Sequence, residues 1–196
     1  MMNRSVRKIV MLLVGVLFIG SGIGLAFYKY SDLLFSRIGV ASASYDGISK
    51  YDPVLHKAFI QKQFKENWYL LVEPADFDVE YMLDNKSPGT YYPQYKGKLT
   101  IVVLYGKGEP VGFGTYYMLN NVAARIQFIA VDEAFRGNRY AEKLVNYALS
   151  DLKKSGARFV RLATRTTNIA AQKVYNRLGF EIVAEDHGFF HYRKDV

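Results

Sequence analysis

A chain of 196 residues, half of them hydrophobic and 22% charged, is long enough for one ordinary domain with a buried core and too apolar for a disordered segment. Half of its net charge of +8 lies within residues 1–40, and the remainder has no dense basic block, which disfavours nucleic-acid binding. Because the sequence contains no cysteine, disulfides, a thiol nucleophile and a thiolate zinc site are excluded.

Residues 9–27 form an uncharged apolar segment near the start of the chain. As a helix this segment spans about 28 Å, close to the thickness of the hydrocarbon core of a bilayer. Phe27, Tyr28 and Tyr30 lie where an interfacial aromatic belt is expected, and Lys29 follows the apolar run. We therefore predict that residues 1–30 hold a single-pass transmembrane helix, through which the protein contacts the membrane.

Two other interpretations of this segment stay open. Residues 9–19 have the length of a signal-peptide core, and residues 24–26 would suit cleavage. A buried globular helix is the third interpretation, which the lack of a polar face disfavours. Gly20 and Gly24 are spaced so that two such helices can approach closely, which leaves a homodimer open.

Residues 31–51 are predicted to be a tether, and residues 52–196 a folded domain. The tether is rich in small and polar residues without a clear period. The domain is expected to begin with Asp52 as the N-cap of a helix that ends near Asn67. A short strand is expected at residues 68–72 and a short helix at residues 77–83.

The rest of the domain alternates between strands and helices. Strands are expected at residues 99–105, 111–118, 122–131, 159–164, 180–184 and 189–193, and helices at residues 138–155 and 169–178. The first three strands form an antiparallel meander. Because a helix then leads into the next strand, those two strands should be parallel neighbours, so the sheet is mixed and the fold class is α/β (α+β).

Residues 136–141 join an apolar strand to an amphipathic helix through a turn that contains Gly137. The free backbone N–H groups of such a turn, together with the positive end of the helix dipole, suit a phosphate. Arg136 and Arg139 add two guanidinium groups. The alternative is an ordinary solvated helix start.

A second segment begins at Asn168 and ends with Gly179 and Phe180. By itself it is typical of an amphipathic helix, in which Asn168 is an N-cap and Tyr175 a half-buried aromatic residue. Its chemical interest comes only from its position about thirty residues after the glycine-containing turn.

Together, in this order, the two segments resemble the acyl-CoA-binding motifs of the GNAT superfamily of N-acetyltransferases. The first family motif is Arg/Gln-x-x-Gly-x-Gly/Ala, which this chain matches at Arg136 and Ala141, with Arg139 in place of the glycine. The second family motif, Asn-x-x-Ala-x-x-x-Tyr-x-x-x-Gly-Phe, is complete. It is formed by Asn168, Ala171, Tyr175, Gly179 and Phe180. The resemblance covers about residues 50–196.

The resemblance implies a GNAT-like mixed, mostly antiparallel central sheet flanked by helices, here preceded by one transmembrane helix. It implies transfer of an acetyl group from acetyl-CoA, the co-substrate, to an amine acceptor by direct nucleophilic attack, without a metal. Main-chain groups for the pantetheine arm would come from Ile129, Ala130 and Val131. The pyrophosphate would be held by Arg136, Gly137, Asn138, Arg139, Tyr140 and Ala141. Asn168 and Ala171 would line the other side of the cofactor, and Tyr175 would be the general acid for the departing thiolate.

Amine acylation also requires that the amine lose a proton. For a lysine-like amine with a pKa of about 10.4, reaching the neutral form at pH 7 costs about 4.6 kcal/mol. Some family members carry a glutamate on the fourth strand for this purpose, but here that strand has Arg125 and Gln127 and no carboxylate. Asp132, Glu133 and Glu109 lie nearby but are typical of turns, so no base is assigned.

The acceptor is not defined by the sequence. Five tyrosines precede or lie on the strands that usually border the acceptor cleft, where they would form an aromatic wall or simply favour strands. They are Tyr91, Tyr92, Tyr95, Tyr116 and Tyr117. His56, His187 and His191 are interpreted as surface or turn residues, since no further metal ligands accompany them.

A second function stays open beside the enzyme: a GNAT-fold module, tethered to the membrane, that binds acyl-CoA or a protein partner without turnover. Arg139 and the missing carboxylate favour this alternative. The side of the membrane is also open. The basic residues before position 9 favour an exported domain, whereas acetyl-CoA is expected inside cells.

Overall fold

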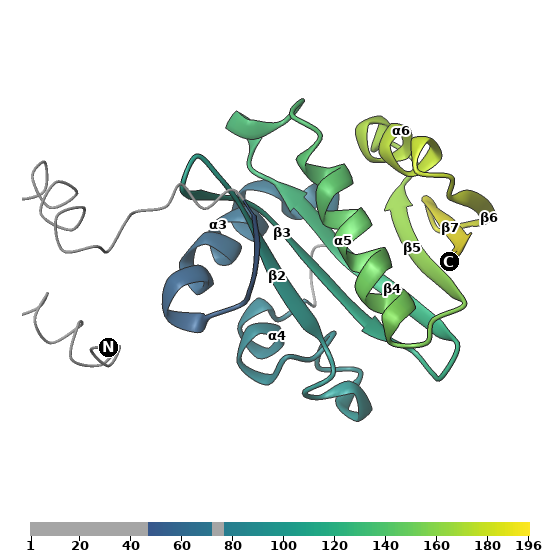
Figure 1. The fold of residues 1–196 in the computed structure, drawn as a ribbon, viewed down its shortest axis with the longest axis horizontal. Helices are drawn as coiled ribbons and strands as arrows, with labels where there is room; N and C mark the ends of the chain where they lie inside the picture. Colours follow the sequence, from purple (N-terminus) through teal and green to yellow (C-terminus); the bar gives the residue numbers. More distant parts are fainter. Residues whose placement is uncertain (1–46, 72–76) are drawn as a thin grey trace, which may run out of the picture. The chain divides into compact units, whose positions relative to one another are not determined.

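The computed structural model describes residues 47–71 and 77–196 (Figure 1). The expected anchor at residues 9–27 and most of the expected tether lie outside these residues. Within the described ranges, no helix has both the length and the apolar character needed to cross a bilayer. These residues belong to one unit of the chain that runs from Tyr45 to Val196.

Seven strands, four α-helices and two 3₁₀ turns make up the described part of the chain. The strands are β1 (Ile48–Lys50), β2 (Thr100–Gly106), β3 (Glu109–Met118), β4 (Ala123–Val131), β5 (Phe159–Arg165), β6 (Glu181–Asp186) and β7 (Phe189–Asp195). The helices are α3 (Pro53–Leu71), α4 (Val79–Asn85), α5 (Tyr140–Lys154) and α6 (Ile169–Arg177), and the 3₁₀ turns are η1 (Pro93–Tyr95) and η2 (Glu133–Phe135).

The strands form one sheet in the order β1-β2-β3-β4-β5-β7-β6. All neighbouring pairs are antiparallel except β4 and β5, which are parallel as the strand–helix–strand pattern predicted. The expected mixed, mostly antiparallel sheet flanked by helices is therefore confirmed. In Figure 1, α5 crosses one face of the sheet and α6 lies beside β5.

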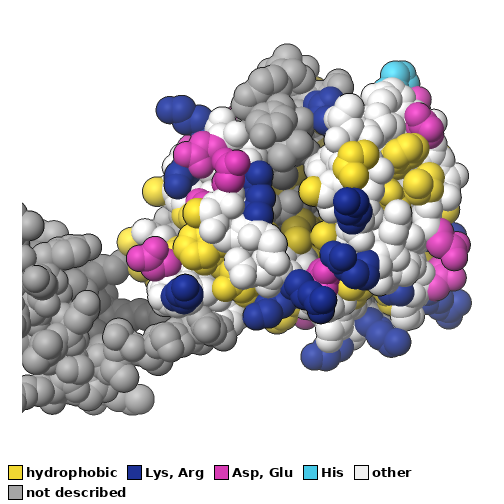
Figure 2. Space-filling view, turned by 90° about the horizontal axis from the view of Figure 1, so that it is seen from above, with side chains coloured by type: hydrophobic (Ala, Val, Ile, Leu, Met, Phe, Trp, Pro, Cys, Tyr) yellow, Lys and Arg dark blue, Asp and Glu magenta, His cyan; other side chains and the backbone are white. Residues whose placement is uncertain are grey.

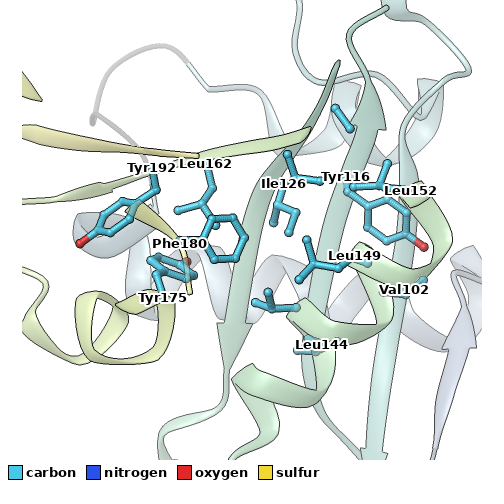
Figure 3. Packing of buried hydrophobic residues seen from close by; sticks show 14 of the residues in the cluster. Val102, Tyr116, Ile126, Leu144, Leu149, Leu152, Leu162, Tyr175, Phe180 and Tyr192 are labelled. Atoms are coloured by element: carbon cyan, nitrogen blue, oxygen red, sulfur yellow. The ribbon is translucent and has the colours of Figure 1, made fainter. Parts of the chain in front are cut away.

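Two apolar clusters lie on opposite faces of the sheet because neighbouring residues of a strand point to opposite faces. On the face under α5, Leu144 and Val145 pack on Val102 and Ile126, and this cluster continues to Tyr175, Phe180 and Tyr192 (Figure 3). On the other face, side chains of α3 and α4 pack on alternate residues of β2, β3 and β4. That second cluster includes Ile60, Phe64, Met82, Val103, Phe113 and Phe128.

Two expectations for the start of the domain are wrong. The strand expected at residues 68–72 does not form, because α3 continues to Leu71 past non-helical backbone at Asn67 (φ −122°). The end of the expected tether is also ordered, since Ile48–Lys50 pairs with β2 as strand β1. Three residues are too few for a periodic pattern, so β1 depends on the edge that β2 offers.

His56 is also not the surface residue that we expected, since it is 2% exposed. Its Nδ1 accepts a hydrogen bond from the Asp52 backbone N–H (2.8 Å), so its Nε2–H is left to donate to the Tyr105 hydroxyl (2.7 Å). Burial lowers the pKa of His56, although the charge of Asp52 opposes this effect. The neutral imidazole thus joins the start of α3 to the end of β2.

Candidate active site

The central sheet opens between β4 and β5. The two parallel strands pair only from Ala123 to Arg125 with residues 159–161. Along its other edge, β5 pairs with β7 over its whole length, from Phe159 to Arg165. The second half of β4 is therefore left with one edge without a strand partner, at the centre of the sheet.

The orientation of the β4 backbone decides which residues face this open edge. Asp132 donates its N–H to Val111 of β3, and Phe128 donates its N–H to Thr115 of β3. Because alternate residues of an antiparallel strand face the same neighbour, Ala130 also directs its main-chain groups to β3. Of the three residues expected to offer main-chain groups, Ile129 and Val131 face the open edge, whereas Ala130 does not.

A β-bulge lies at Gln127, because Thr115 pairs with Phe128 while the next residue, Tyr116, pairs with Ile126. The side-chain amide nitrogen of Gln127 donates to the Pro88 carbonyl (2.6 Å). Its amide oxygen is buried and accepts no hydrogen bond from the described residues. Bulges often re-aim a side chain beside an active site, and this one places an unused acceptor next to the open edge.

The glycine-containing turn follows β4 and leads into α5. Gly137 has a φ of +85°, which only glycine adopts without strain. Arg139, the N-cap of α5, has a φ of 57° and a ψ of 21° and is also left-handed. Our expectation that the helix includes Arg139 is therefore wrong. The family motif prefers glycine here, and the observed conformation supplies a backbone reason for that preference.

Several backbone donors of this turn are unused. Among the described residues, none accepts a hydrogen bond from the N–H groups of Gly137, Asn138 and Arg139, and the N-cap of α5 has no side-chain acceptor. The N–H groups at the start of α5 add to this set because a helix leaves its first donors unpaired. The turn can therefore hold an anion with backbone groups.

The side chains of Asn138, Tyr140 and Ala141 make contacts that fix the conformation of the turn and of the start of α5. Asn138 donates to the Phe135 carbonyl (3.1 Å). Tyr140 packs over Gly106 at the end of β2, where an added Cβ would lie 2.7 Å from its hydroxyl. Ala141 is half-buried in the first turn of α5. Tyr140 and Ala141 thus position the helix start while their backbone N–H groups stay at its open end.

A chain of hydrogen bonds joins the two ends of the loop after β4 through helix α3. Arg136 donates to the Asn67 side chain (2.6 Å), Asn67 donates to Gln63 (3.2 Å), and Gln63 donates to Asp132 (2.9 Å). Gln63 is fully buried and Asn67 is 6% exposed. The guanidinium of Arg136 also donates to the Val131 carbonyl (3.3 Å). Arg136 is thus held against α3 and β4.

This chain disfavours Asp132 as the base that removes a proton from the amine. Burial raises the pKa of Asp132, but hydrogen bonds from Ala134, Lys62 and Gln63 outweigh burial and lower it. A carboxylate with a lowered pKa is a weak base. Asp132 is therefore better suited to shaping the loop.

Helix α6 supplies the other predicted cofactor residues. Asn168 is its N-cap and accepts from the Ala171 N–H (3.2 Å), as the sequence indicated. Arg177 of α6 pairs with Glu142 of α5 (2.7 Å), which joins the two helices that follow β4 and β5. The two predicted motifs therefore lie on helices that contact each other.

Tyr175 is 8% exposed and packs against Phe180 and Tyr192, with ring centroids 5.9 and 5.6 Å away. Figure 3 shows these three rings together, with Ile126 of β4 and Leu144 of α5 further across the same core. Burial raises the pKa of Tyr175 to about 12. Its phenol is therefore protonated at neutral pH.

The tyrosines expected to form an aromatic wall divide between the faces of the sheet. Tyr95 packs between Tyr92 and Tyr117 on the α3 face. Tyr116 instead lies on the α5 face, where its hydroxyl donates to Asp151 (2.9 Å). Tyr91 is 72% exposed. Only part of the expected wall is therefore assembled.

Figure 2 views the molecule from the end where β4 and β5 finish and α5 and α6 begin. The surface is hollowed there, with hydrophobic side chains inside the hollow and Lys and Arg side chains beside it. Pockets of about 310 and 290 Å³ lie elsewhere, beside Asp151 and beside Tyr147. We base the site on the open edge of β4, because the unused backbone donors lie there.

The fold is that of the GNAT family of acetyltransferases. The family model of GNAT acetyltransferases matches residues 63–180, and the chain belongs to this family. Acetyl-CoA is the co-substrate that membership of this family implies. Among the described residues, no three side chains of metal-ligating type are grouped.

The chain is 32% identical over 87 residues to the uncharacterized N-acetyltransferase YvbK of Bacillus subtilis, across 42% of this chain and 56% of that protein. It therefore spans about half the length of this curated relative. A GNAT-family protein of Desulfovibrio desulfuricans superposes with a TM-score of 0.60 at 13% identity, over 76% of this chain and 97% of that one. The ribosomal-protein-S18-alanine N-acetyltransferase of Escherichia coli gives 0.56 at 16% identity, over 76% and 92%. These two likenesses show the fold.

Proposed function

We propose that this protein transfers the acetyl group of acetyl-CoA to an amine, and that the open edge of β4 is where the transfer takes place. The observation that carries this proposal is the coincidence of two features. The main-chain groups of Ile129 and Val131 face a break in the sheet, and unused N–H groups at the start of α5 follow directly after it. An extended pantetheine arm can pair with the first feature and a pyrophosphate with the second.

In this arrangement the chain mainly positions the reactants. Holding the thioester along β4 and the amine beside it replaces a bimolecular encounter by a reaction between aligned groups. The nitrogen attacks the thioester carbonyl, a C–N bond forms as the C–S bond breaks, CoA leaves as the thiolate, and the amine proton is lost to solvent. The buried amide oxygen of Gln127 can accept a hydrogen bond from the attacking nitrogen.

Tyr175 is proposed to assist the departure of CoA. A thiol has a pKa of about 8.5, so a phenol with a pKa of about 12 would lose its proton to the thiolate at a cost of about 5 kcal/mol. A hydrogen bond from the phenol to the sulfur avoids this cost and still stabilises the developing charge. We therefore assign Tyr175 to hydrogen-bond donation in the transition state.

Calorimetry of the full-length protein with acetyl-CoA, followed by thiol release with a panel of amines, tests the proposal. We expect binding, and CoA release that depends on the amine. The Tyr175→Phe variant should bind acetyl-CoA as the wild type does but turn over about 10–100-fold more slowly. The matched control is Tyr147→Phe, which removes an exposed phenol from α5 and should not change turnover.

The outcomes separate the two functions. Absence of binding at millimolar acetyl-CoA would refute the proposal. Binding without CoA release for any amine would instead support the non-catalytic acyl-CoA-binding module.

We also propose that residues 9–27 anchor the domain to a membrane. The length of this uncharged segment and the aromatic residues that follow it support the anchor. A membrane-bound acceptor would then be reached without diffusion of the enzyme through the bulk solution.

A further inference from the structure

Three arginines lie side by side across the sheet. Arg125 of β4 pairs in register with Arg161 of β5, and Arg161 pairs in register with Arg193 of β7. Neighbouring strands are about 4.8 Å apart, and residues in register point to the same face. We call these three residues the arginine row.

The row lies on the face of the sheet opposite α5. Val160 and Leu162, which flank Arg161 in sequence, are buried in the cluster under α5, so Arg161 points to the other face. On β3 the row is continued by Tyr117, which pairs in register with Arg125. Burial raises the pKa of Tyr117, and the charge of Arg125 opposes that rise, consistent with their proximity.

The three guanidinium groups differ in whether a carboxylate lies close enough to neutralise their charge. Arg193 pairs with Asp195 (3.0 Å), and Glu181 of β6 lies next to it in register. Arg161 and Arg193 both lie over the ring of Phe159, at 5.2 and 4.1 Å from its centroid. By contrast, no carboxylate among the described residues forms an ion pair with Arg125 or Arg161, and both residues are exposed.

Like charges directly opposite each other on neighbouring strands destabilise a sheet. A row in which two neighbouring arginines have no carboxylate partner among the described residues is thus unfavourable for folding alone. An anion placed between the two guanidinium groups would remove the repulsion and gain charge-assisted hydrogen bonds. The arrangement therefore suits a carboxylate or a phosphate.

The position of the row links it to the open edge of β4. The pair of Arg125 and Arg161 is the last one before β4 and β5 separate. Gln127 is two residues further along β4 and Ile129 four, so the backbone of the row lies about 7–13 Å from the residues that face the reaction site. That distance fits the first few residues of a peptide or a compact amino acid derivative.

We infer that the acceptor is an amine that carries an anionic group, a carboxylate or a phosphate, and that Arg125 and Arg161 bind this group while the nitrogen reaches the thioester. This inference rests on the proposed function and names the substrate class of the same site. Arg193 supports the row through Phe159 and Asp195.

The test uses pentapeptides with a free N-terminus that differ only at positions 2 and 3, which hold glutamate, phosphoserine or glutamine. Their binding to the full-length protein is measured through a C-terminal fluorophore, and their acetylation through thiol release. We expect the glutamate or the phosphoserine peptide to bind about tenfold or more tightly than the glutamine peptide, and the preference to shrink with added salt. Whichever anionic peptide binds better identifies the anion.

The variants Arg125→Gln and Arg161→Gln should each remove most of this preference without changing the affinity for acetyl-CoA. Arg158→Gln is the matched control, because Arg158 lies just before β5 and outside the row. Equal binding of all three peptides, or an equal loss in the Arg158 variant, would overturn the inference. Since peptide binding is measured directly, failure of acetyl-CoA binding would count against the proposed function alone.

Discussion

Arg139 combines a long charged side chain with a backbone conformation that favours glycine. A left-handed conformation costs a non-glycine residue about 1 kcal/mol, and no side-chain hydrogen bond caps α5 at this residue. The strain is therefore compensated elsewhere, and the guanidinium remains exposed next to the unused N–H groups.

We predict that Arg139→Gly raises the free energy of unfolding by about 0.5–1 kcal/mol, because it relieves the strain. Arg139→Ala, which loses the charge but keeps the strain, should not be stabilised. Denaturant unfolding of the two variants measures the difference. A glycine variant no more stable than the alanine variant would contradict this account.

His56 makes stability depend on pH. Its pKa is lowered in the folded protein, so below about pH 6.5 the unfolded chain binds a proton that the native state refuses. The contribution of His56 is therefore complete above that pH, and it is lost as pH falls from the unfolded pKa towards the folded pKa.

We predict that His56→Gln destabilises the protein at pH 7.5 and that this loss shrinks towards pH 5, by at most about 1.4 kcal/mol per pH unit. Denaturant unfolding at a series of pH values measures the difference in the free energy of unfolding between the wild type and the variant. His187→Gln, at an exposed residue of the β6–β7 turn, is the control. If this difference stays constant or grows as the pH falls, the buried imidazole is not the cause of the pH dependence.

At the scale of elements, the bend of α3 at Asn67 connects that helix to the loop after β4. The non-helical backbone of Asn67 coincides with a side chain that accepts from Arg136 and donates to Gln63. Each bond runs from a cation towards an anion, and such chains strengthen their members. The helix on one face of the sheet therefore helps to set the shape of the turn proposed to hold the pyrophosphate.

We predict that Gln63→Leu lowers the free energy of unfolding by about 1–3 kcal/mol, because it removes the buried link between Asn67 and Asp132. It should also weaken acetyl-CoA binding, since the loop loses its support. Denaturant unfolding and calorimetry measure the two effects. Lys65→Ala, an exposed change on the same helix, should leave both unchanged, and a normal affinity in Gln63→Leu would refute the link to the loop.

At the scale of the whole molecule, the proposed anchor at residues 9–27 would bring the domain to a membrane surface. We predict that the full-length protein floats with phosphatidylcholine vesicles, and that Leu17→Arg, in the middle of residues 9–27, prevents this, because a charge at the centre of a bilayer is unfavourable. Leu33→Arg, outside the apolar run, is the matched control. A wild-type protein that does not float would refute the anchor.

Most of the strands and helices could be predicted from local pattern. The short apolar runs of β2 and β3, which are buried on both faces of the sheet, and the apolar stripe of α5 are strong signals, and turn residues bound each of them. The strand expected at residues 68–72 failed because a short apolar run suits a helix equally well. The strand β1 was missed because it is too short to have a pattern.

The candidate site, too, has one part that local sequence predicts and another part that it does not. The two motifs located the turn at residues 136–141 and the cap at Asn168, because such features depend on neighbours in sequence. The roles of Gln63 and Asn67 carried no sequence signal, since a polar residue on a helix is usually solvated. A glutamine that is fully buried is explained only by its partners, one of which comes from 69 residues further along the chain.

The sequence by itself determined the family, the order of the elements and the two segments proposed to hold the cofactor, because local periodicity and short motifs are written in consecutive residues. Only the tertiary structure decided which main-chain groups face the open edge, that Arg139 is left-handed, and that three arginines meet across the sheet. Strand register and backbone orientation arise from pairing between distant segments, and no single segment contains them.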